Sequence, residues 1–478
     1  MNQTLNIDTL MQFGPFIVML IAPVILMIIV ALKRNHMITW IYTLVTLLVT
    51  MILAAAGGEQ ETMFDLFTID KFTLFYTILF SAAGFMIALS CYSYFEKSEE
   101  QKEEFYILLV FAILGSSMLV ASNHFVSLFI SLEVLSISLY SLIGYFKKTP
   151  GGIEAAIKYL VLAAMSSAVM IFGMALIYLE TGTMEFSLMG NRLSSAGMSP
   201  WILGGMALLT AGAGFKLSVA PFHWWTPDVY QGASSPVTSL VATISKGGML
   251  GALIRLFMAV NGLEYPSMVL AIGIIAILSM FTGNILALLQ TNVKRILAYS
   301  SISHLGYILI AFLAGKQHGT EAATFYLVAY FATTIGAFAV ITVLATAAGE
   351  PEEINEYKGL FYRNPWLAAF FSLIMFSLAG IPLTAGFVGK FYIAAAGVDV
   401  GLWTLLIVLA VNSVIGVFYY LRVVATMFSK QDESKGMEVR PMLISAGGIT
   451  LFIIAAVILW VGVSPSWLIR VIEGVAGF

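Results

Sequence analysis

Long apolar stretches separated by short polar segments run through the whole chain. Each stretch holds 18 or more mostly apolar residues, about the length at which an α-helix crosses the hydrocarbon core of a bilayer. The pattern predicts an all-α, polytopic membrane protein with about 14 transmembrane helices. The predicted spans are 15–32, 37–56, 71–92, 105–122, 124–145, 155–179, 199–232, 236–259, 266–289, 293–314, 319–347, 365–397, 401–428 and 441–464.

Two spans, 199–232 and 365–397, are too long for one straight crossing at about 1.5 Å per residue. Pro221 and Pro227 interrupt the first, and Pro382 interrupts the second. Proline removes a backbone donor and clashes with the preceding turn, so each span is expected to be a broken helix. The alternative is that the prolines only kink two ordinary membrane helices.

The two interrupted spans are five spans apart, an odd number, so they cross the membrane in opposite directions. Paired broken helices in this relation are typical of the inverted repeats of ion-coupled transporters. The expected units are the first three helices in 1–100, a five-helix repeat in 101–260, a second, inverted five-helix repeat in 261–430, and a last helix in 431–478.

Composition supports the membrane assignment and excludes other classes of protein. The 478 residues are 60% hydrophobic and only 10% charged, whereas soluble proteins carry about 25% charged residues. The net charge of −3 provides no basic field for nucleic acid. The single cysteine, Cys91, cannot form an internal disulfide or hold an iron–sulfur cluster or zinc. No glycine-rich nucleotide-binding motif is found.

Positive charge is concentrated in alternate loops. Fourteen lysines and arginines lie in or beside the loops on one side of the spans, against four on the other side. Cytoplasmic loops carry such an excess, so both termini are predicted to lie outside the cytoplasm. The fourteen are Lys33, Arg34, Lys97, Lys102, Lys147, Lys148, Lys158, Lys294, Arg295, Lys358, Arg363, Lys430, Lys435 and Arg440. The acidic run EPEEINEYK at 350–358 is expected to be a solvated loop.

A few titratable residues lie inside the spans. Glu133, Lys246 and His304 are near the middle of three different spans, and Lys216 and Lys390 lie beside the two helix breaks. A lysine at the bilayer centre costs roughly 2.5–3.5 kcal/mol on insertion scales, so such residues persist mainly where they pair, meet water or take part in function. These five residues are the candidate functional site.

Polar residues follow the same faces at helical spacing. Ser136 lies three residues after Glu133, while Ser239 and Thr243 lie seven and three residues before Lys246. Such stripes could hold water beside each titratable group and continue a proton path between spans. The alternative is a helix-packing surface, for which membrane proteins also use serine and threonine.

Glu154 and Lys158 are one helical turn apart at the start of the sixth span. An ordinary i,i+4 ion pair explains them. A site for proton uptake at the inner surface would have the same appearance, so both interpretations stay open.

Several of these segments resemble a known family. The segments are SLEVLSISLYSLIGY, GFKLSVAPFHWWTPDVYQGASSPVTSLVATISK, LAYSSISHLGY and SLAGIPLTAGFVGKFY. They resemble the antiporter-like membrane subunits of respiratory complex I, the NADH–quinone oxidoreductase, over about residues 100–430. The resemblance is strongest to the N-type subunits. M-type subunits have glutamate where Lys390 stands, and L-type subunits carry a long lateral helix after the last spans.

The resemblance implies roles for the candidate residues in a proton path. Glu133 matches the glutamate of the fifth helix, and Lys216 matches its partner lysine on the seventh. Lys246 matches the central lysine of the eighth helix, followed by His304 on the tenth. Lys390 matches the terminal lysine of the broken twelfth helix.

The family also implies the setting in which the chain works. It resembles a proton-translocating subunit of an enzyme complex, a translocase that carries no redox chemistry in this chain. The chain itself is expected to hold no cofactor or metal, while NADH, FMN, iron–sulfur clusters and quinone belong to other subunits. Expected partners are the M-type and K-type neighbours, the lateral helix of the L-type subunit, lipids, and protons as the transported ion. The expected location is a bacterial inner membrane, with both termini periplasmic.

Two other functions stay open on sequence alone. One is a subunit of a multisubunit Na⁺/H⁺ antiporter, because that superfamily shares the segment at 212–246. The other is a structural subunit whose buried charges only specify assembly.

Overall fold

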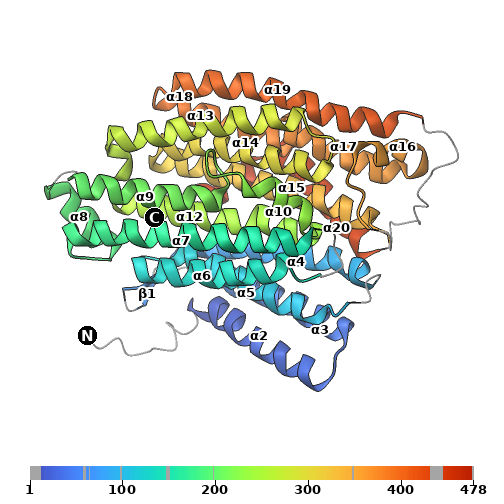
Figure 1. Cartoon of the computed structure of the whole chain (residues 1–478), viewed down its shortest axis with the longest axis horizontal. Helices are drawn as coiled ribbons and strands as arrows, with labels where there is room; N and C mark the ends of the chain where they lie inside the picture. The colour runs from blue at the N-terminus through green and yellow to red at the C-terminus, as the bar shows by residue number, and fades with distance from the viewer. Residues whose placement is uncertain are drawn as a thin grey trace.

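The structure is a computed structural model that describes residues 12–57, 61–63, 65–96, 100–146, 151–196, 199–346, 349–430 and 445–475. Within these ranges, twelve helical segments are long and apolar enough to cross a membrane. Most of them run side by side along the long axis of the molecule (Figure 1). They are α2 (Gly14–Leu32), α3 (His36–Ala56), α4 (Lys71–Glu96), α5 (Glu103–Ala121), α6 (Phe125–Ile143), α7 (Gly152–Thr181), α11 to α12 (Ser235–Ala259), α13 (Pro266–Leu288), α14 (Val293–Ala314), α15 (Lys316–Leu344), α19 (Trp403–Phe428) and α20 (Ala446–Val463).

The two remaining predicted spans are broken helices, as expected from their prolines. The first consists of α9 (Pro200–Leu217) and α10 (Trp225–Gly232), and the second of α17 (Pro365–Ala379) and α18 (Ala385–Asp399). Twelve continuous segments and two broken ones account for the fourteen predicted spans. Residues 441–444 of the last predicted span lie outside the described residues, as do the predicted inner-loop cations Lys97, Lys147, Lys148, Lys435 and Arg440.

Short elements connect the spans. A π-helical turn, η1 (Val241–Ser245), separates α11 (Ser235–Leu240) from α12 (Lys246–Ala259). Strands β1 (Glu61–Met63) and β2 (Phe67–Ile69) form an antiparallel pair with Thr62 opposite Thr68. The other connecting elements are α8 (Phe186–Ala196), η2 (Gly262–Glu264), η3 (Ile354–Tyr357) and α16 (Leu360–Arg363), and α21 (Ser466–Glu473) follows the last span.

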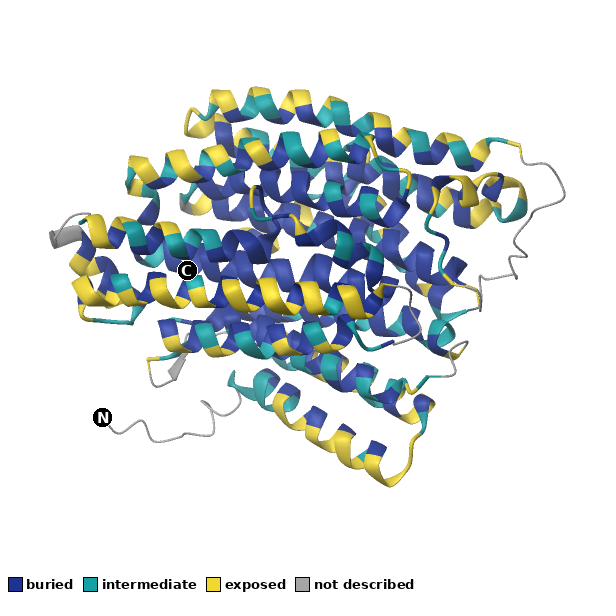
Figure 2. Cartoon of the chain, in the orientation of Figure 1, coloured by how far each residue is buried: buried dark blue, intermediate teal, exposed yellow. Residues whose placement is uncertain are grey.

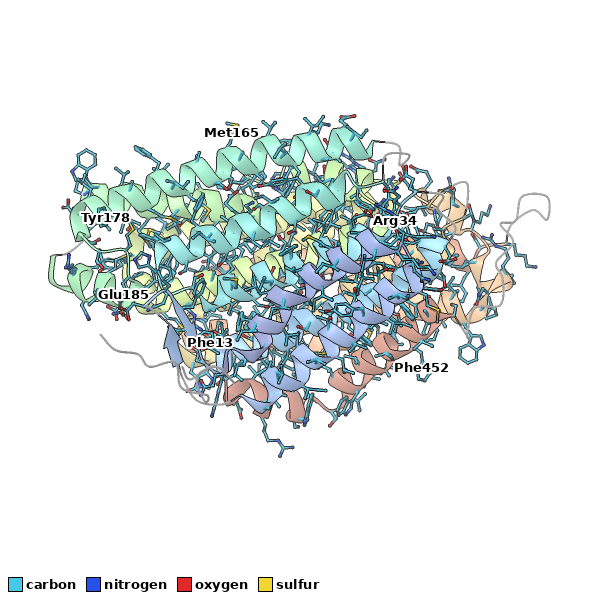
Figure 3. The ribbon with its side chains drawn as sticks, turned by 90° about the horizontal axis from the view of Figure 1, so that it is seen from below. Phe13, Arg34, Met165, Tyr178, Glu185 and Phe452 are labelled. Atoms are coloured by element: carbon cyan, nitrogen blue, oxygen red, sulfur yellow. The ribbon has the colours of Figure 1, made fainter. Side chains whose placement is uncertain are left out.

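Burial divides the helices into a centre and a periphery. The α11–α12 segment and α14 are buried along their whole membrane spans, and α15 is buried along most of its span. Outer helices such as α2, α7 and α19 present exposed faces (Figure 2). Met165 of α7 and Phe452 of α20 lie on the outside of the bundle (Figure 3). Exposed apolar surface of this extent suits lipid, and it leaves the titratable central helices shielded from the lipid.

Helices α7 and α9 pack closely through facing glycines. A Cβ atom on Gly205 would lie 2.7 Å from the Gly173 carbonyl oxygen, and one on Gly173 would lie 2.6 Å from the Gly205 carbonyl oxygen. Small residues allow helix backbones to approach in this way inside membranes. The contact holds α9, which carries Lys216, against α7.

We predict that Gly205→Ala destabilises the protein by about 1–3 kcal/mol, because the added methyl group meets backbone atoms that cannot move aside. The measurement is the thermal unfolding of the detergent-solubilised protein. Gly204→Ala is the matched control, since a Cβ atom there comes no closer than 3.9 Å to a neighbour. Equal stability of the two variants would contradict the prediction.

Candidate functional site

Lys216 lies at the C-terminal end of the first half-helix. Helix α9 ends at Leu217, because Ser218 adopts a left-handed conformation with φ of 61°. The Lys216 ammonium is buried, donates to Ser136 Oγ at 2.6 Å and lies 5.7 Å from the centre of the Tyr159 ring. A cation at this position is stabilised by the negative end of the helix dipole.

Glu133, on α6, is held by two hydroxyl groups. Ser167 Oγ donates to its Oε1 at 2.7 Å, and the Tyr140 hydroxyl lies 3.5 Å from its Oε2. Among the described residues, no ion pair within 4.0 Å joins Glu133 to Lys216. Lys216 thus bonds Ser136, which lies one helical turn from Glu133 on α6, and does not bond the Glu133 carboxylate itself.

Lys246 is the first residue of α12, directly after the π-helical turn η1. Its fully buried ammonium donates to Ser301 Oγ of α14 at 2.5 Å and lies 5.4 Å from the centre of the Tyr230 ring. The predicted stripe on its own helix does not reach it. Thr243 donates to the backbone carbonyl of Ser239 instead.

His304, on α14, lies between two tyrosine hydroxyl groups. Its Nδ1 is 2.6 Å from the Tyr326 hydroxyl of α15, and its Nε2 is 3.0 Å from the Tyr420 hydroxyl of α19. Tyr420 also hydrogen-bonds Ser300. All of these groups are buried.

Lys390 is placed by the second helix break. It lies on α18, and its ammonium donates to the carbonyl oxygens of Ala379 at 2.9 Å and Leu378 at 3.4 Å, in the last turn of α17. A Cβ atom on Gly380, whose φ is +83°, would lie 3.1 Å from the Lys390 Nζ. Glycine at this position therefore provides both the turn and the space for the lysine.

The structure brings the candidate residues into two groups. Lys216 and Glu133 meet around Ser136 and α6. Lys246 and His304 meet across the Ser301–Tyr330 hydroxyl pair and the Tyr330 ring, whose centre lies 5.7 Å from that of His304. The Tyr307 ring then lies next to both His304, at 5.5 Å between ring centres, and the Lys390 ammonium, at 5.2 Å. Lys246, His304 and Lys390 thus follow one another through buried polar and aromatic side chains.

Glu154 and Lys158 form the predicted i,i+4 ion pair at 2.6 Å, and they line an open cavity of about 270 Å³. The cavity also contains Asp228 of α10, which accepts from Lys158 at 3.0 Å and from Arg295 at 3.0 Å. Sequence reasoning missed Asp228. Its signal is a carboxylate in the second half of a broken span, within TPDVY.

The expectation of a solvated loop is wrong for Glu350. Its side chain, only 9% exposed, pairs with the buried Lys294 ammonium at 2.9 Å, and its carboxylate accepts from the Ser235 backbone and hydroxyl and from Tyr94. Burial acts to raise the pKa of Glu350, but the Lys294 charge and the Ser235 hydrogen bonds outweigh it and leave the pKa below its ordinary value. The cluster holds the connection between α10 and α11.

Within the described ranges, no group of three or more histidine, cysteine, aspartate or glutamate side chains is placed to hold a metal ion. The site is therefore built from lysines, one histidine, carboxylates and hydroxyl groups.

Comparisons with known proteins agree with this architecture. Residues 122–416 match the family described as "NADH:quinone oxidoreductase/Mrp antiporter, TM". A protein of Methylococcus capsulatus named NADH-quinone oxidoreductase subunit N is 41% identical over 468 residues, which cover 97% of this chain and 94% of that protein. The chain belongs to the NADH-quinone oxidoreductase subunit N family. A second subunit N, from Nitrosospira multiformis, is 43% identical over 99% of this chain and 97% of its own length.

A solved structure extends the match to the fold of a chain of respiratory complex I. A chain in the structure of respiratory complex I from Thermus thermophilus with bound aureothin superposes with a TM-score of 0.83 at 28% identity. The match covers 96% of this chain and 99% of that chain. The predicted family and the predicted all-α membrane fold are both confirmed.

We predict that Glu350→Gln weakens the folded protein by about 3–5 kcal/mol at pH 7, because it leaves the Lys294 ammonium buried without its carboxylate. The folded-state pKa of Glu350 lies below its ordinary value of 4.5, so this contribution is present above about pH 4.5 and is lost as the pH falls through the lowered pKa. The measurement is the difference in thermal stability between the variant and the unmodified protein at several pH values.

The matched control is Glu264→Gln, which changes an exposed carboxylate in η2. A stability difference for Glu350→Gln that did not shrink in acid would contradict the assignment of the ion pair.

Proposed function

We propose that this chain translocates protons across the membrane as the N-type subunit of respiratory complex I, driven by electron transfer from NADH to quinone in other subunits. The proton path consists of Glu133, Lys216, Lys246, His304 and Lys390. Glu154 and Lys158 take up protons together with Asp228. The named relatives support the subunit type, and the arrangement of the buried cations supports the path.

One observation carries the proposal. Lys216, Lys246 and Lys390 make their described hydrogen bonds only to hydroxyl and carbonyl oxygens, with no carboxylate within 4.0 Å among the described residues. In the same protein, the buried cations Arg255 and Lys294 are each paired with a carboxylate. Lys216 and Lys246 are buried and Lys390 is half-buried. An ammonium without a carboxylate partner is costly in such surroundings, so a lysine in this setting can release its proton and take it up again. A structural cation with a fixed counter-ion cannot do so easily.

Proton uptake is placed at the charged cavity. The side chains of Glu154, Lys158 and Asp228 line it, and Arg295 contacts Asp228 from the adjacent helix α14. Lys158 and Arg295 belong to the set of cations on the side with the positive excess, so we assign the cavity to the cytoplasmic side. The location that follows is a bacterial inner membrane with both termini on the periplasmic side.

The driving force comes from outside the chain. Moving one proton against each 100 mV costs about 2.3 kcal/mol, and the residues of this path contain no source of that free energy. We assign its supply to neighbouring M-type and K-type subunits and to the lateral helix of the L-type subunit. NADH, FMN, iron–sulfur clusters and quinone are placed on other subunits, with none in this chain. The two five-helix repeats, at 101–260 and 261–430, form the two units of the path. The first three helices, in 1–100, and the last helix, in 431–478, lie outside the repeats.

The alternative is a subunit of a multisubunit Na⁺/H⁺ antiporter, which the description of the matched family includes. The full-length relatives named subunit N favour the complex I assignment. Dependence of transport on sodium in the absence of NADH would support the antiporter instead.

We predict that Lys246→Met in the assembled complex lowers NADH-driven proton pumping at least about tenfold, because it removes a proton-transfer group from the middle of the path. The measurement is the pumping rate in proteoliposomes, scaled to the amount of assembled complex. Lys358→Met, at an exposed lysine, is the control. If Lys246→Met pumps with the normal ratio of protons to electrons, Lys246 has no part in the path.

We predict that Asp228→Asn slows pumping several-fold, because Lys158 and Arg295 lose the carboxylate that they share. Pumping by the assembled complex is compared with that of Asp399→Asn, which changes an exposed aspartate at the end of α18. Equal rates in these two variants would remove the cavity from the pathway.

A further inference from the structure

The hydrogen bonds around His304 are unequal on its two sides. Tyr420, beside Nε2, has a second partner in Ser300. Tyr326, beside Nδ1, has no other hydrogen-bond partner in the part of the chain that the structure describes. Because Tyr326 is buried, the Nδ1 lone pair is the one acceptor that the described residues offer to its hydroxyl proton.

This asymmetry determines which nitrogen carries the proton in the neutral ring. If Tyr326 donates to Nδ1, the ring proton lies on Nε2 and is donated to the Tyr420 oxygen. Tyr420 then donates its own proton to Ser300. The Ser300 hydroxyl in turn has Tyr419 within hydrogen-bond reach, and Tyr419 donates to Asn284 Oδ1 at 3.0 Å, so each donor along this chain has an acceptor. With the ring proton on Nδ1 instead, Tyr326 becomes the acceptor and its own proton is left without a partner.

We infer that Tyr326 is a positioning residue for His304 that holds the neutral imidazole in its Nε2–H form. The inference rests on the proposed function. With Nε2 already protonated, His304 takes up a proton only at Nδ1, once the Tyr326 hydroxyl turns away, and releases the other proton from Nε2 toward Tyr420. A proton that crosses the ring by this step enters on the α15 side and leaves on the α19 side. The ring then carries its proton on Nδ1, and the Tyr326 hydrogen bond favours its return to the Nε2–H form before the next transfer.

The packing of Tyr326 holds its hydroxyl in place. Its ring stacks on His304 with 5.8 Å between ring centres, and a Cβ atom on Gly389 would lie only 2.7 Å from its Cδ2. Gly389 precedes Lys390 on α18. The tyrosine is thus fixed between the histidine and the helix that carries the terminal lysine.

The test uses assembled complex in proteoliposomes and compares Tyr326→Phe, His304→Asn and the double variant. Tyr326→Phe is expected to change the ratio of the two neutral tautomers about two- to tenfold, the effect of one neutral hydrogen bond. It is also expected to lower the number of protons pumped per NADH. The double variant is expected to pump no less than His304→Asn alone, because Tyr326 acts through His304.

The tautomer is read from ¹⁵N-labelled histidine by solid-state NMR, with the His304→Asn complex identifying the signal. The control for losing a buried tyrosine hydroxyl is Tyr76→Phe, whose hydroxyl bonds Thr324 at 3.2 Å, away from His304. If Tyr326→Phe assembles poorly, Gly389→Ala keeps the hydroxyl and displaces the ring, and the same tautomer shift is expected.

The outcomes separate the inference from the proposed function. Normal pumping by His304→Asn removes His304 from the proton path, and the inference with it. Impaired pumping by His304→Asn with an unchanged tautomer in Tyr326→Phe overturns the role of Tyr326 alone. Additive losses in the double variant also overturn it, since they would mean that the tyrosine acts independently of the histidine.

Discussion

Inside a bilayer, every backbone donor and acceptor needs a partner within the protein, and the two helix breaks are where this constraint acts most strongly. At the first break, the Phe215 carbonyl accepts from the Ser218 backbone N–H at 3.0 Å and from the Trp225 indole at 3.0 Å. At the second break, the Lys390 ammonium satisfies the freed carbonyl of Ala379. The hydrogen bond at the second break has a charged donor, and a charged donor bonds more strongly than a neutral one. The local backbone of α17 is therefore tied to the protonation of Lys390.

Cations serve two different purposes in this chain. Arg255 and Lys294 are buried against carboxylates and join segments far apart in sequence, with Asp70 and Glu350 as partners. Lys216, Lys246 and Lys390 have hydroxyl and carbonyl neighbours instead. A fixed counter-ion would stabilise one protonation state, whereas hydroxyl groups can both donate and accept. In the proposed function, this difference in environment separates the cations that hold the fold from those that exchange protons.

The sequence predicted the spans, the two breaks and the burial of Lys216 and Lys246, because hydropathy and proline act locally. It did not predict that the Lys216 ammonium bonds Ser136 rather than Glu133, since that choice depends on how α6 and α9 pack. Glu350 looked solvated because its run is acidic, while its burial arises from contacts with helices distant in sequence. Tyr326 carried no signal, because one tyrosine among many becomes informative only once its neighbours are known.

The π-helical turn η1 constrains how many residues the chain can have between α11 and α12. A π turn contains one residue more than an α turn, and each residue of an α-helix advances the direction of its side chain by about 100°. Removing one residue from Val241–Ser245 would restore an ordinary helix, but would also turn Lys246 by about that angle relative to α11. Lys246 faces Ser301 because the turn just before it contains one residue more than an α-helical turn. Variation in this segment is therefore constrained in residue number as well as in residue type.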